Sequence, residues 1–181
     1  MKIEIRYREG LKELMKTMPL EDINVVMLCE YVKSNRQTFY YHYRDIADVI
    51  ELIFLKERVG YGVKIFSIEN VLKPLIAYIN SNHQFLHAVA VSFASDKLEN
   101  FFYSYFYQQS LKYFKHVGLD QRINANDLRD IGRYISSLFS KEMLYWVINK
   151  RSEKQNELQT RLTILWNLFI DKYPREKAVM R

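Results

Sequence analysis

The amino-acid sequence predicts an all-α protein, with a three-helix head at the N-terminus joined to a larger helical body. Apolar residues recur at helical spacing through most of the 181 residues. The chain has only 5 glycines and 3 prolines, too few for a protein built from short strands and turns. Residues that favour helix starts also stand before several of the periodic stretches.

The first helix is expected over residues 4–17. Its apolar stripe consists of Tyr7, Leu11, Leu14 and Met18. Pro19 follows the stripe and is expected to end the helix. The other faces of this helix carry three basic residues, Arg6, Arg8 and Lys12. Either all three are solvated, or one of them contacts a DNA phosphate.

Two short helices separated by Lys33-Ser34 follow. Asn24 can cap a helix from Val25 to about Val32, and Asn35 can cap a second from Arg36 to about Tyr43. On the second helix, Phe39 and Tyr43 are four residues apart and share the face expected to pack inward. The opposite face carries Arg36 and Tyr40, with Gln37 and Tyr41 beside them. An Arg-Gln pair at a helix start suits base edges and phosphates in a major groove.

Net charge does not carry the nucleic-acid prediction. The whole chain has a net charge of +6, but residues 1–58 contain ten basic and ten acidic side chains. Residues 1–58, which contain the predicted head, therefore have no net charge, and non-specific DNA binding is expected to be weaker than for a uniformly basic domain.

The run Asn-Arg-Gln-Thr-Phe-Tyr-Tyr-His-Tyr at 35–43, preceded by Ile-Asn-Val at 23–25 and Leu-Cys-Glu at 28–30, resembles the DNA-binding domain of the TetR family. The resemblance implies a DNA-binding head at residues 1–45 and an effector-binding, dimerising body at 46–181. It also implies that these residues contact a double-stranded operator: Asn24, Asn35, Arg36, Gln37, Thr38, Tyr40, Tyr41, His42 and Arg44. The chain departs from the family where Gly and an apolar residue are usual and Lys33 and Ser34 stand instead. Two outcomes are therefore open: Lys33 adopts a strained positive φ, or the turn differs from that of the family.

The resemblance implies a cytoplasmic, homodimeric repressor controlled by a small apolar or aromatic ligand. One alternative is an activator that works with a separate ligand-sensing partner protein, similar to the subgroup that activates dihydroxyacetone kinase operons. Another is an adaptor whose head no longer binds DNA.

Asp45, with Asp48 at the third position, is expected to cap a helix from Ile46 to about Arg58. Gly60 and Gly62 then mark either a flexible joint or a simple helix end. Further helices are expected over 68–80, 83–95, 96–117 with Asp96 as cap, 126–150 with Asn126 or Asp127 as cap, and beyond residue 152.

The predicted helix 96–117 has aromatic residues on every face, which indicates that it is enclosed. Core packing is one outcome. The other is a pocket for an apolar or aromatic ligand, lined by Phe102, Tyr103, Tyr105, Phe106 and Gln109.

The last two predicted helices are apolar on more than one face. They are expected to form a four-helix bundle with a second copy across a two-fold axis. The predicted interface consists of Phe139, Met143, Trp146, Leu162, Leu165, Trp166 and Phe169.

The sequence contains no recognisable catalytic set or phosphate loop, so we expect neither an enzyme nor a cofactor. His83 and His87 are spaced like metal ligands, but no third ligand is evident and we expect no metal site. The one cysteine, Cys29, is expected to be a small buried residue. No apolar run is long enough to cross a membrane, and the first residues do not resemble a secretory signal.

Overall fold

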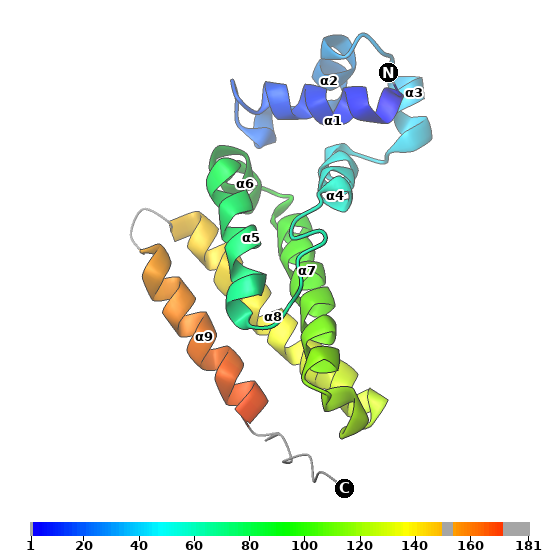
Figure 1. Ribbon diagram of the computed structural model, residues 1–181. Helices are drawn as coiled ribbons and strands as arrows, with labels where there is room; N and C mark the ends of the chain where they lie inside the picture. Colours follow the sequence, from blue (N-terminus) through cyan, green and yellow to red (C-terminus); the bar gives the residue numbers. More distant parts are fainter. Residues whose placement is uncertain (1, 150–153, 172–181) are drawn as a thin grey trace, which may run out of the picture. The chain divides into compact units, whose positions relative to one another are not determined.

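The computed structural model describes residues 2–149 and 154–171, and its helices are drawn in Figure 1. No strand occurs among these residues, and the predicted all-α fold class is confirmed. The elements in chain order are α1 (Ile3–Leu14), the 3-10 turn η1 (Leu20–Asp22), α2 (Val25–Tyr31), α3 (Arg36–His42), α4 (Ile46–Lys56), α5 (Ile68–Ser81), α6 (His83–Ala90), α7 (Ser95–His116), the 3-10 turn η2 (Leu119–Gln121), α8 (Ala125–Asn149) and α9 (Gln155–Asp171).

The described residues fall into two compact units. The head unit is drawn from Met1–Arg58 and Ile79–Phe101, and the body unit from Val59–Tyr78 and Phe102–Arg181. The head unit is larger than the domain predicted at residues 1–45, because it also includes α4, α6 and the first turns of α7. Among the described helices, none is long and apolar enough to pass through a membrane.

Side-chain caps begin three helices of the head unit, as predicted. The side-chain oxygens of Asn24, Asn35 and Asp45 each accept the backbone N–H three residues further on, at 3.0, 2.8 and 3.0 Å. Each cap satisfies an N–H that the helix itself leaves without a partner. The starts of α2, α3 and α4 are therefore determined by short-range sequence.

In the head unit, α1 packs against α2 and α4, and α2 packs against α3. The side chains at the centre of this packing are fully buried: Tyr7, Leu11, Leu28, Phe39 and Ile50. Burying each apolar side chain of this size contributes about 1.5–3 kcal/mol. The predicted inward face of α3 is confirmed, since Tyr43 is also buried and its ring centroid lies 5.4 Å from that of Phe39.

Ion pairs connect α4 to the rest of the head unit. Lys12 Nζ of α1 lies 3.1 Å from Glu57 Oε1, directly after α4. Lys97 Nζ of α7 lies 3.2 Å from Glu51 Oε2 on α4. These pairs add to the packing of α1 against α4, which places α4 in the same compact unit as the predicted DNA-binding helices.

Two predicted caps and two predicted helix ends were wrong, one of them that of α1, which ends at Leu14, three residues before its predicted end. Asp96 lies inside the first turn of α7, which starts at Ser95, and its carboxylate is 3.4 Å from Lys97 Nζ. Asn124 caps α8, because its Oδ1 accepts the backbone N–H groups of both predicted caps, Asn126 and Asp127, at 3.0 Å.

Helix α6 ends at Ala90, five residues before the predicted end. The Ser92 hydroxyl donates to the carbonyl of Val89 at 2.8 Å and accepts the N–H of Ala94 at 3.1 Å. A serine that bonds to nearby backbone in this way offers an alternative to continued helix.

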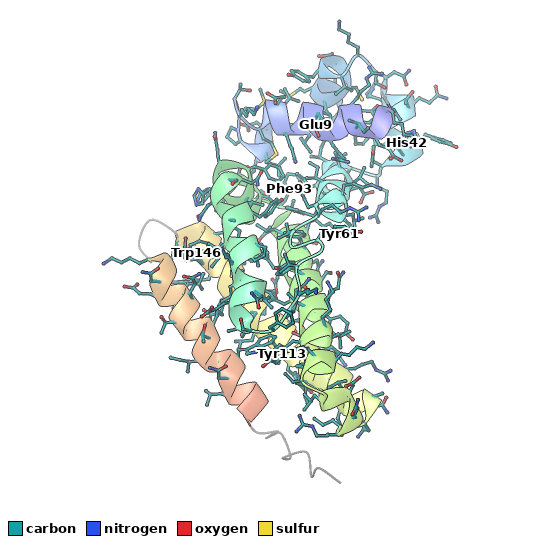
Figure 2. The ribbon with its side chains drawn as sticks, viewed as in Figure 1. Glu9, His42, Tyr61, Phe93, Tyr113 and Trp146 are labelled. Atoms are coloured by element: carbon teal, nitrogen blue, oxygen red, sulfur yellow. The ribbon has the colours of Figure 1, made fainter. Side chains whose placement is uncertain are left out.

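The body unit has an aromatic core. The Phe139 ring of α8 lies with its centroid 5.2 Å from that of Phe106 on α7 and 6.0 Å from that of Trp166 on α9. The ring of Tyr113 on α7, which is labelled in Figure 2, has its centroid 5.1 Å from that of Trp166 in edge-on geometry. These contacts join three helices around side chains that are large and have specific packing geometry.

Gly10 permits α1 to approach the C-terminal end of α2. A Cβ atom at this position would lie 2.3 Å from Val32 Cγ1 and 3.3 Å from Tyr31 Cδ1. Such a separation is far below van der Waals contact, so any side chain here would push the two helices apart.

We predict that Gly10→Ala destabilises the protein by about 1–3 kcal/mol, the usual cost of overpacking a core. This loss outweighs the gain in helix propensity of up to about 1 kcal/mol that alanine provides. Chemical denaturation measures the change. Gly132→Ala in α8 is the matched control, because its nearest neighbour is the Tyr107 ring at 3.3 Å, and the control should unfold close to the wild type. Equal stabilities for the two variants would contradict the close approach.

Candidate nucleic-acid interface

Helix α3 presents a polar and aromatic face that no other described element covers. Arg36, Gln37 and His42 are exposed, as are 58% of Tyr40 and 84% of Tyr41. The exposed side chains along α3, with His42 labelled, are drawn in Figure 2. Large aromatic side chains are normally buried. Two neighbouring exposed tyrosines beside an arginine and a glutamine therefore mark this face as a contact surface.

The remaining predicted interface residues have mixed roles. Thr38 is half-buried, and its backbone N–H is the donor in the α3 cap. Asn24 and Asn35 are exposed, and each uses its side-chain oxygen as a helix cap. The fold places Asn35 at the start of α3, whereas Asn24 stands at the start of α2.

The turn between α2 and α3 is a Schellman motif with a lysine in the left-handed position. Lys33 has a φ of 53°, and its N–H donates to the carbonyl of Glu30 at 3.1 Å. The N–H of Ser34 donates to the carbonyl of Cys29 at 2.8 Å. Glycine is the usual residue at this position because it has no Cβ. Of the two alternatives for this turn, a left-handed Lys33 or a different turn, the structure has the left-handed Lys33, where a non-glycine residue is strained.

Side chains of helix α1 form hydrogen bonds to this turn. Arg6 Nη2 donates to the carbonyls of both Val32 and Lys33, the second at 2.9 Å. The Tyr7 hydroxyl donates to Ser34 Oγ at 2.8 Å. Three consecutive turn residues are thus each bonded to one short stretch of α1.

The Tyr7 ring lies between the turn and α3. Its centroid is 5.4 Å from that of Phe39 and 5.6 Å from that of Tyr43, both in edge-on geometry. Burial raises the pKa of the Tyr7 hydroxyl and, together with the nearby Glu4 carboxylate, raises the pKa of Tyr43 to about 12. Burial also raises the pKa of the Cys29 thiol, which is buried as predicted. These groups are therefore neutral at physiological pH.

Arg44 is more constrained than the sequence indicated. Its Nε and Nη2 atoms lie 2.9 and 2.7 Å from the two carboxylate oxygens of Asp48, and its backbone N–H donates to the same group at 2.9 Å. The Arg44 guanidinium holds the pKa of the Asp48 carboxyl below its usual value. The positive charge at Arg44 is therefore balanced locally, although 82% of its side chain is exposed.

Sequence reasoning missed the contribution of α1 to this site. The sequence indicates only that Arg6 is solvated or binds a phosphate, and it gives no reason to single out Gly10. The available signal was their spacing of four residues, which places both on one face of α1. Nothing in the sequence identifies the turn at 32–34 as the surface that this face meets.

The predicted ligand-pocket residues of α7 are mostly engaged with the core. Phe102, Phe106 and Gln109 are buried, and the Tyr105 hydroxyl donates to the Val71 carbonyl at 2.7 Å. Tyr103 is half-buried and stacks on Tyr107, with ring centroids 6.1 Å apart. Burial raises the pKa of Tyr105. The aromatic cluster thus has a packing role in this structure, and its use as a pocket stays a prediction.

Most of the residues predicted to form the dimer interface lie in the interior of a single chain. Five of them are fully buried within a single chain: Phe139, Met143, Trp146, Leu162 and Trp166. They form the core of the body unit and have no surface to offer a second copy. Leu165 is half-buried, and the side chain of Phe169 lies outside the described part of the structure.

A second apolar stripe stays exposed on the same two helices. On α8, Tyr134, Tyr145 and Ile148 are 67%, 58% and 39% exposed. On α9, Ile164 and Leu168 are 56% and 62% exposed. We call these five residues the outer stripe. Their spacing of three, four or eleven residues places the members of each helix on one face.

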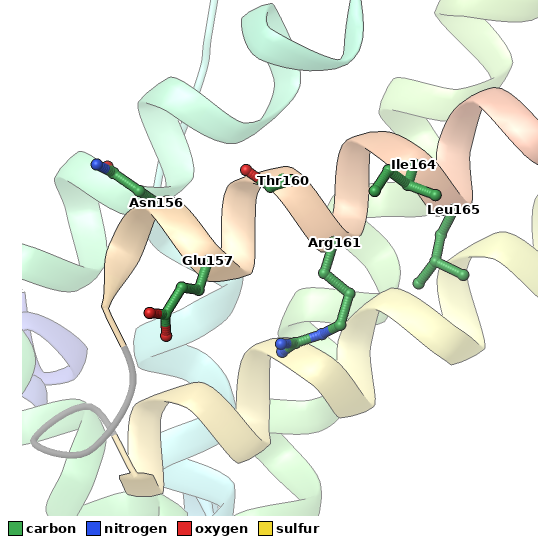
Figure 3. Close-up of a pocket in the computed structure, with 6 residues that line it drawn as sticks. All are labelled: Asn156, Glu157, Thr160, Arg161, Ile164 and Leu165. Atoms are coloured by element: carbon green, nitrogen blue, oxygen red, sulfur yellow. The ribbon is translucent and has the colours of Figure 1, made fainter.

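One residue of the outer stripe, Ile164, also lines a surface groove on α9. The groove has a volume of about 480 Å³ and is lined by two adjoining rows, Asn156, Thr160 and Ile164 and then Glu157, Arg161 and Leu165 (Figure 3). Arg161 reaches across to α8, where its Nη2 lies 2.8 Å from Glu142 Oε2. This ion pair, made by a residue that lines the groove, joins α9 to α8.

A smaller hollow of about 210 Å³ lies in the head unit between α1 and the start of α6, lined in part by Lys12, Lys16 and Phe85. The predicted pair His83 and His87 has ring centroids 5.8 Å apart. Among the described residues, no group of three or more His, Cys, Asp or Glu side chains is arranged to hold a metal ion.

The fold is similar to a solved structure named dihydroxyacetone kinase operon activator DhaS. The two chains share 20% sequence identity with a TM-score of 0.60, and the match covers 93% of this chain and 94% of the other. At this identity the likeness concerns the fold. No curated protein matches the sequence.

Residues 67–168 match the family model TetR_C_8, described as a transcriptional regulator C-terminal region. This match spans more than half of the chain and lies outside the motif at 35–43 on which the sequence resemblance was based. The two regions therefore point to one family independently, and the protein belongs to the TetR family of transcriptional regulators.

Proposed function

We propose that the protein is a sequence-specific regulator that binds double-stranded operator DNA as a cytoplasmic homodimer. The observation that carries this proposal is the exposed face of α3. Arg36 and Gln37 stand at its start, and Tyr40 and Tyr41 stand one turn later. The other face of the helix is fixed in the core through Phe39.

This geometry suits a helix inserted into a major groove. An arginine at the N-terminal end of such a helix can make a bidentate contact to guanine, and a glutamine can do so to adenine. Tyrosine hydroxyls and Thr38 are suited to phosphate oxygens, which position the protein without reading sequence. Arg36 and Gln37 are therefore assigned to base reading, and Tyr40, Tyr41 and His42 to the backbone.

We predict that Arg36→Ala weakens operator binding by roughly 1–3 kcal/mol and relaxes preference at one base pair. The operator is first located in DNA upstream of the gene, by fluorescence anisotropy against scrambled competitor and across salt concentrations. Arg129→Ala removes an equivalent exposed charge from α8 and should leave affinity close to the wild type. An unchanged affinity for Arg36→Ala would remove this face of α3 from the interface.

The homodimer is proposed to form through the outer stripe. Five exposed apolar side chains on two adjoining helices are more than an isolated chain needs, and two copies of α8 and α9 can cover them in a four-helix bundle. A dimer also supplies two α3 helices, which is how regulators with one short reading helix bind successive major grooves. The proposed interface is thus still a four-helix bundle, but its contacts are made by the outer stripe and not by the buried residues of α8 and α9.

We predict that Ile164→Glu converts the dimer into a monomer, because a carboxylate buried in an apolar interface without a partner is strongly unfavourable. Light scattering coupled to size-exclusion chromatography measures the mass. Val91→Glu is the matched control, since Val91 in the head unit is also 56% exposed and lies outside the stripe. A dimer that survives Ile164→Glu, or a monomeric wild type, would refute this interface.

The direction of regulation has two candidates. Repression controlled by a small apolar or aromatic ligand follows from the family resemblance. Activation together with a separate ligand-sensing partner is favoured by the name of the similar structure, an operon activator, and by the packing of the α7 aromatics against the core. Deleting the gene separates them, because transcription from the operator should rise for a repressor and fall for an activator.

The alternative function is that of an adaptor protein whose head no longer binds DNA. The neutral head favours it, whereas the exposed face of α3 favours a DNA reader. Salt dependence distinguishes the two. Protein binding releases counterions from the DNA phosphates, and because this release is less favourable at high salt, DNA affinity falls steeply as the salt concentration rises. Absence of any specific, salt-sensitive binding would support the adaptor.

A further inference from the structure

We propose that Arg6 is a positioning residue for DNA recognition, which holds the strained turn before α3 through its backbone carbonyls. The proposal rests on the DNA-binding function proposed above. It assigns to Arg6 a role through the turn, in place of a direct contact with a phosphate.

The turn requires an external support because Lys33 has a left-handed conformation. At a φ of 53°, a lysine is less stable than the glycine that usually ends a helix in this way. The carbonyls of Val32 and Lys33 are also at the C-terminal end of α2, where the helix dipole is negative. The Arg6 guanidinium donates to both carbonyls and brings a positive charge to that end.

The rest of the α1 face reinforces this contact. Gly10, one turn after Arg6, has space only for a hydrogen atom against Val32. Tyr7 donates to Ser34 at 2.8 Å and is fully buried. The face therefore determines the path of the backbone through 32–34 by direct contact with each residue of the turn.

The path of the turn determines the position of α3. Ser34 is followed directly by Asn35, whose side chain caps α3 at 2.8 Å, and then by Arg36 and Gln37. A base contact is lost when its side chain is displaced by about 1 Å, because hydrogen bonds weaken steeply away from their preferred geometry. Release of the turn is therefore expected to reduce affinity even though Arg6 touches no base.

The experiment is a double-mutant cycle between Arg6→Ala and Lys33→Gly. Operator affinity is measured for the wild type, both single variants and the double variant at several salt concentrations, and thermal unfolding is followed for the same four proteins. Lys16→Ala, which removes another positive charge from the region of α1, is the matched control. It corrects for the general loss of attraction to DNA.

We expect Arg6→Ala to weaken operator binding about tenfold or more, the effect of losing a hydrogen-bonded charge. The dependence of affinity on salt should match that of Lys16→Ala. Adding Lys33→Gly should restore most of the affinity, because glycine holds the left-handed conformation without support. Lys33→Gly alone should raise the melting temperature.

A phosphate contact by Arg6 would give the opposite pattern. The slope of log affinity against log salt would fall by about one, and Lys33→Gly would restore nothing. That result, or an affinity unchanged by Arg6→Ala, would overturn the proposal. If Arg6→Ala does not fold, Arg6→Lys replaces it in the cycle. A phosphate contact predicts near wild-type binding for Arg6→Lys, whereas the positioning role predicts a loss that Lys33→Gly repairs.

The two proposals fail in different ways. A folded wild type that binds no operator would overturn the DNA-binding function and, with it, the consequence for recognition. Operator binding by the wild type, with additive effects of Arg6→Ala and Lys33→Gly on melting and affinity, would overturn the role of Arg6 alone.

Discussion

The geometry of the head unit depends on the contact between one face of α1 and the turn at 32–34. Gly10 permits the approach, Arg6 bonds to the carbonyls of the turn, and Tyr7 reaches Ser34 while its ring packs on Phe39. Packing and polar bonding are coupled here, because the hydrogen bonds form only at the helix separation that Gly10 allows. The exposed face of α3 is therefore held, through the turn, by bonds from residues 26 or 27 positions earlier in the chain.

Features decided by short-range chemistry could be predicted from the sequence. The caps Asn24, Asn35 and Asp45 act on groups three residues away, and the burial of Phe39 with Tyr43 follows from their spacing on one helix. The support of the turn by Arg6 spans 27 residues, and helical spacing alone cannot identify a partner at that distance. Ser34 shows the same limit. It stands where the family usually has an apolar residue, and its hydroxyl accepts a hydrogen bond from Tyr7 on another helix.

The body unit shows a different limit of periodicity. An apolar stripe predicts that a helix face is buried, but not which surface buries it. The strongest stripe on α8 and α9 includes Phe139 and Trp166, and a single chain already encloses both. The weaker outer stripe, which includes Tyr145 and Ile164, is the one that a second chain can reach. The most apolar residues of the two helices are therefore those of the chain's own core, because their burial gives the larger gain in free energy.

Charge places a further demand on the proposed DNA complex. The first 58 residues have no net charge, and the exposed Arg44 is balanced by Asp48. Long-range attraction to phosphates therefore contributes little, and affinity has to come from a few well-placed contacts on α3. Contacts of that kind need a rigid support, which the α1 face provides. They also gain from duplication, because in a dimer the second head binds at the high effective concentration set by the first. A rigid turn and the proposed dimer are thus two answers to one electrostatic constraint.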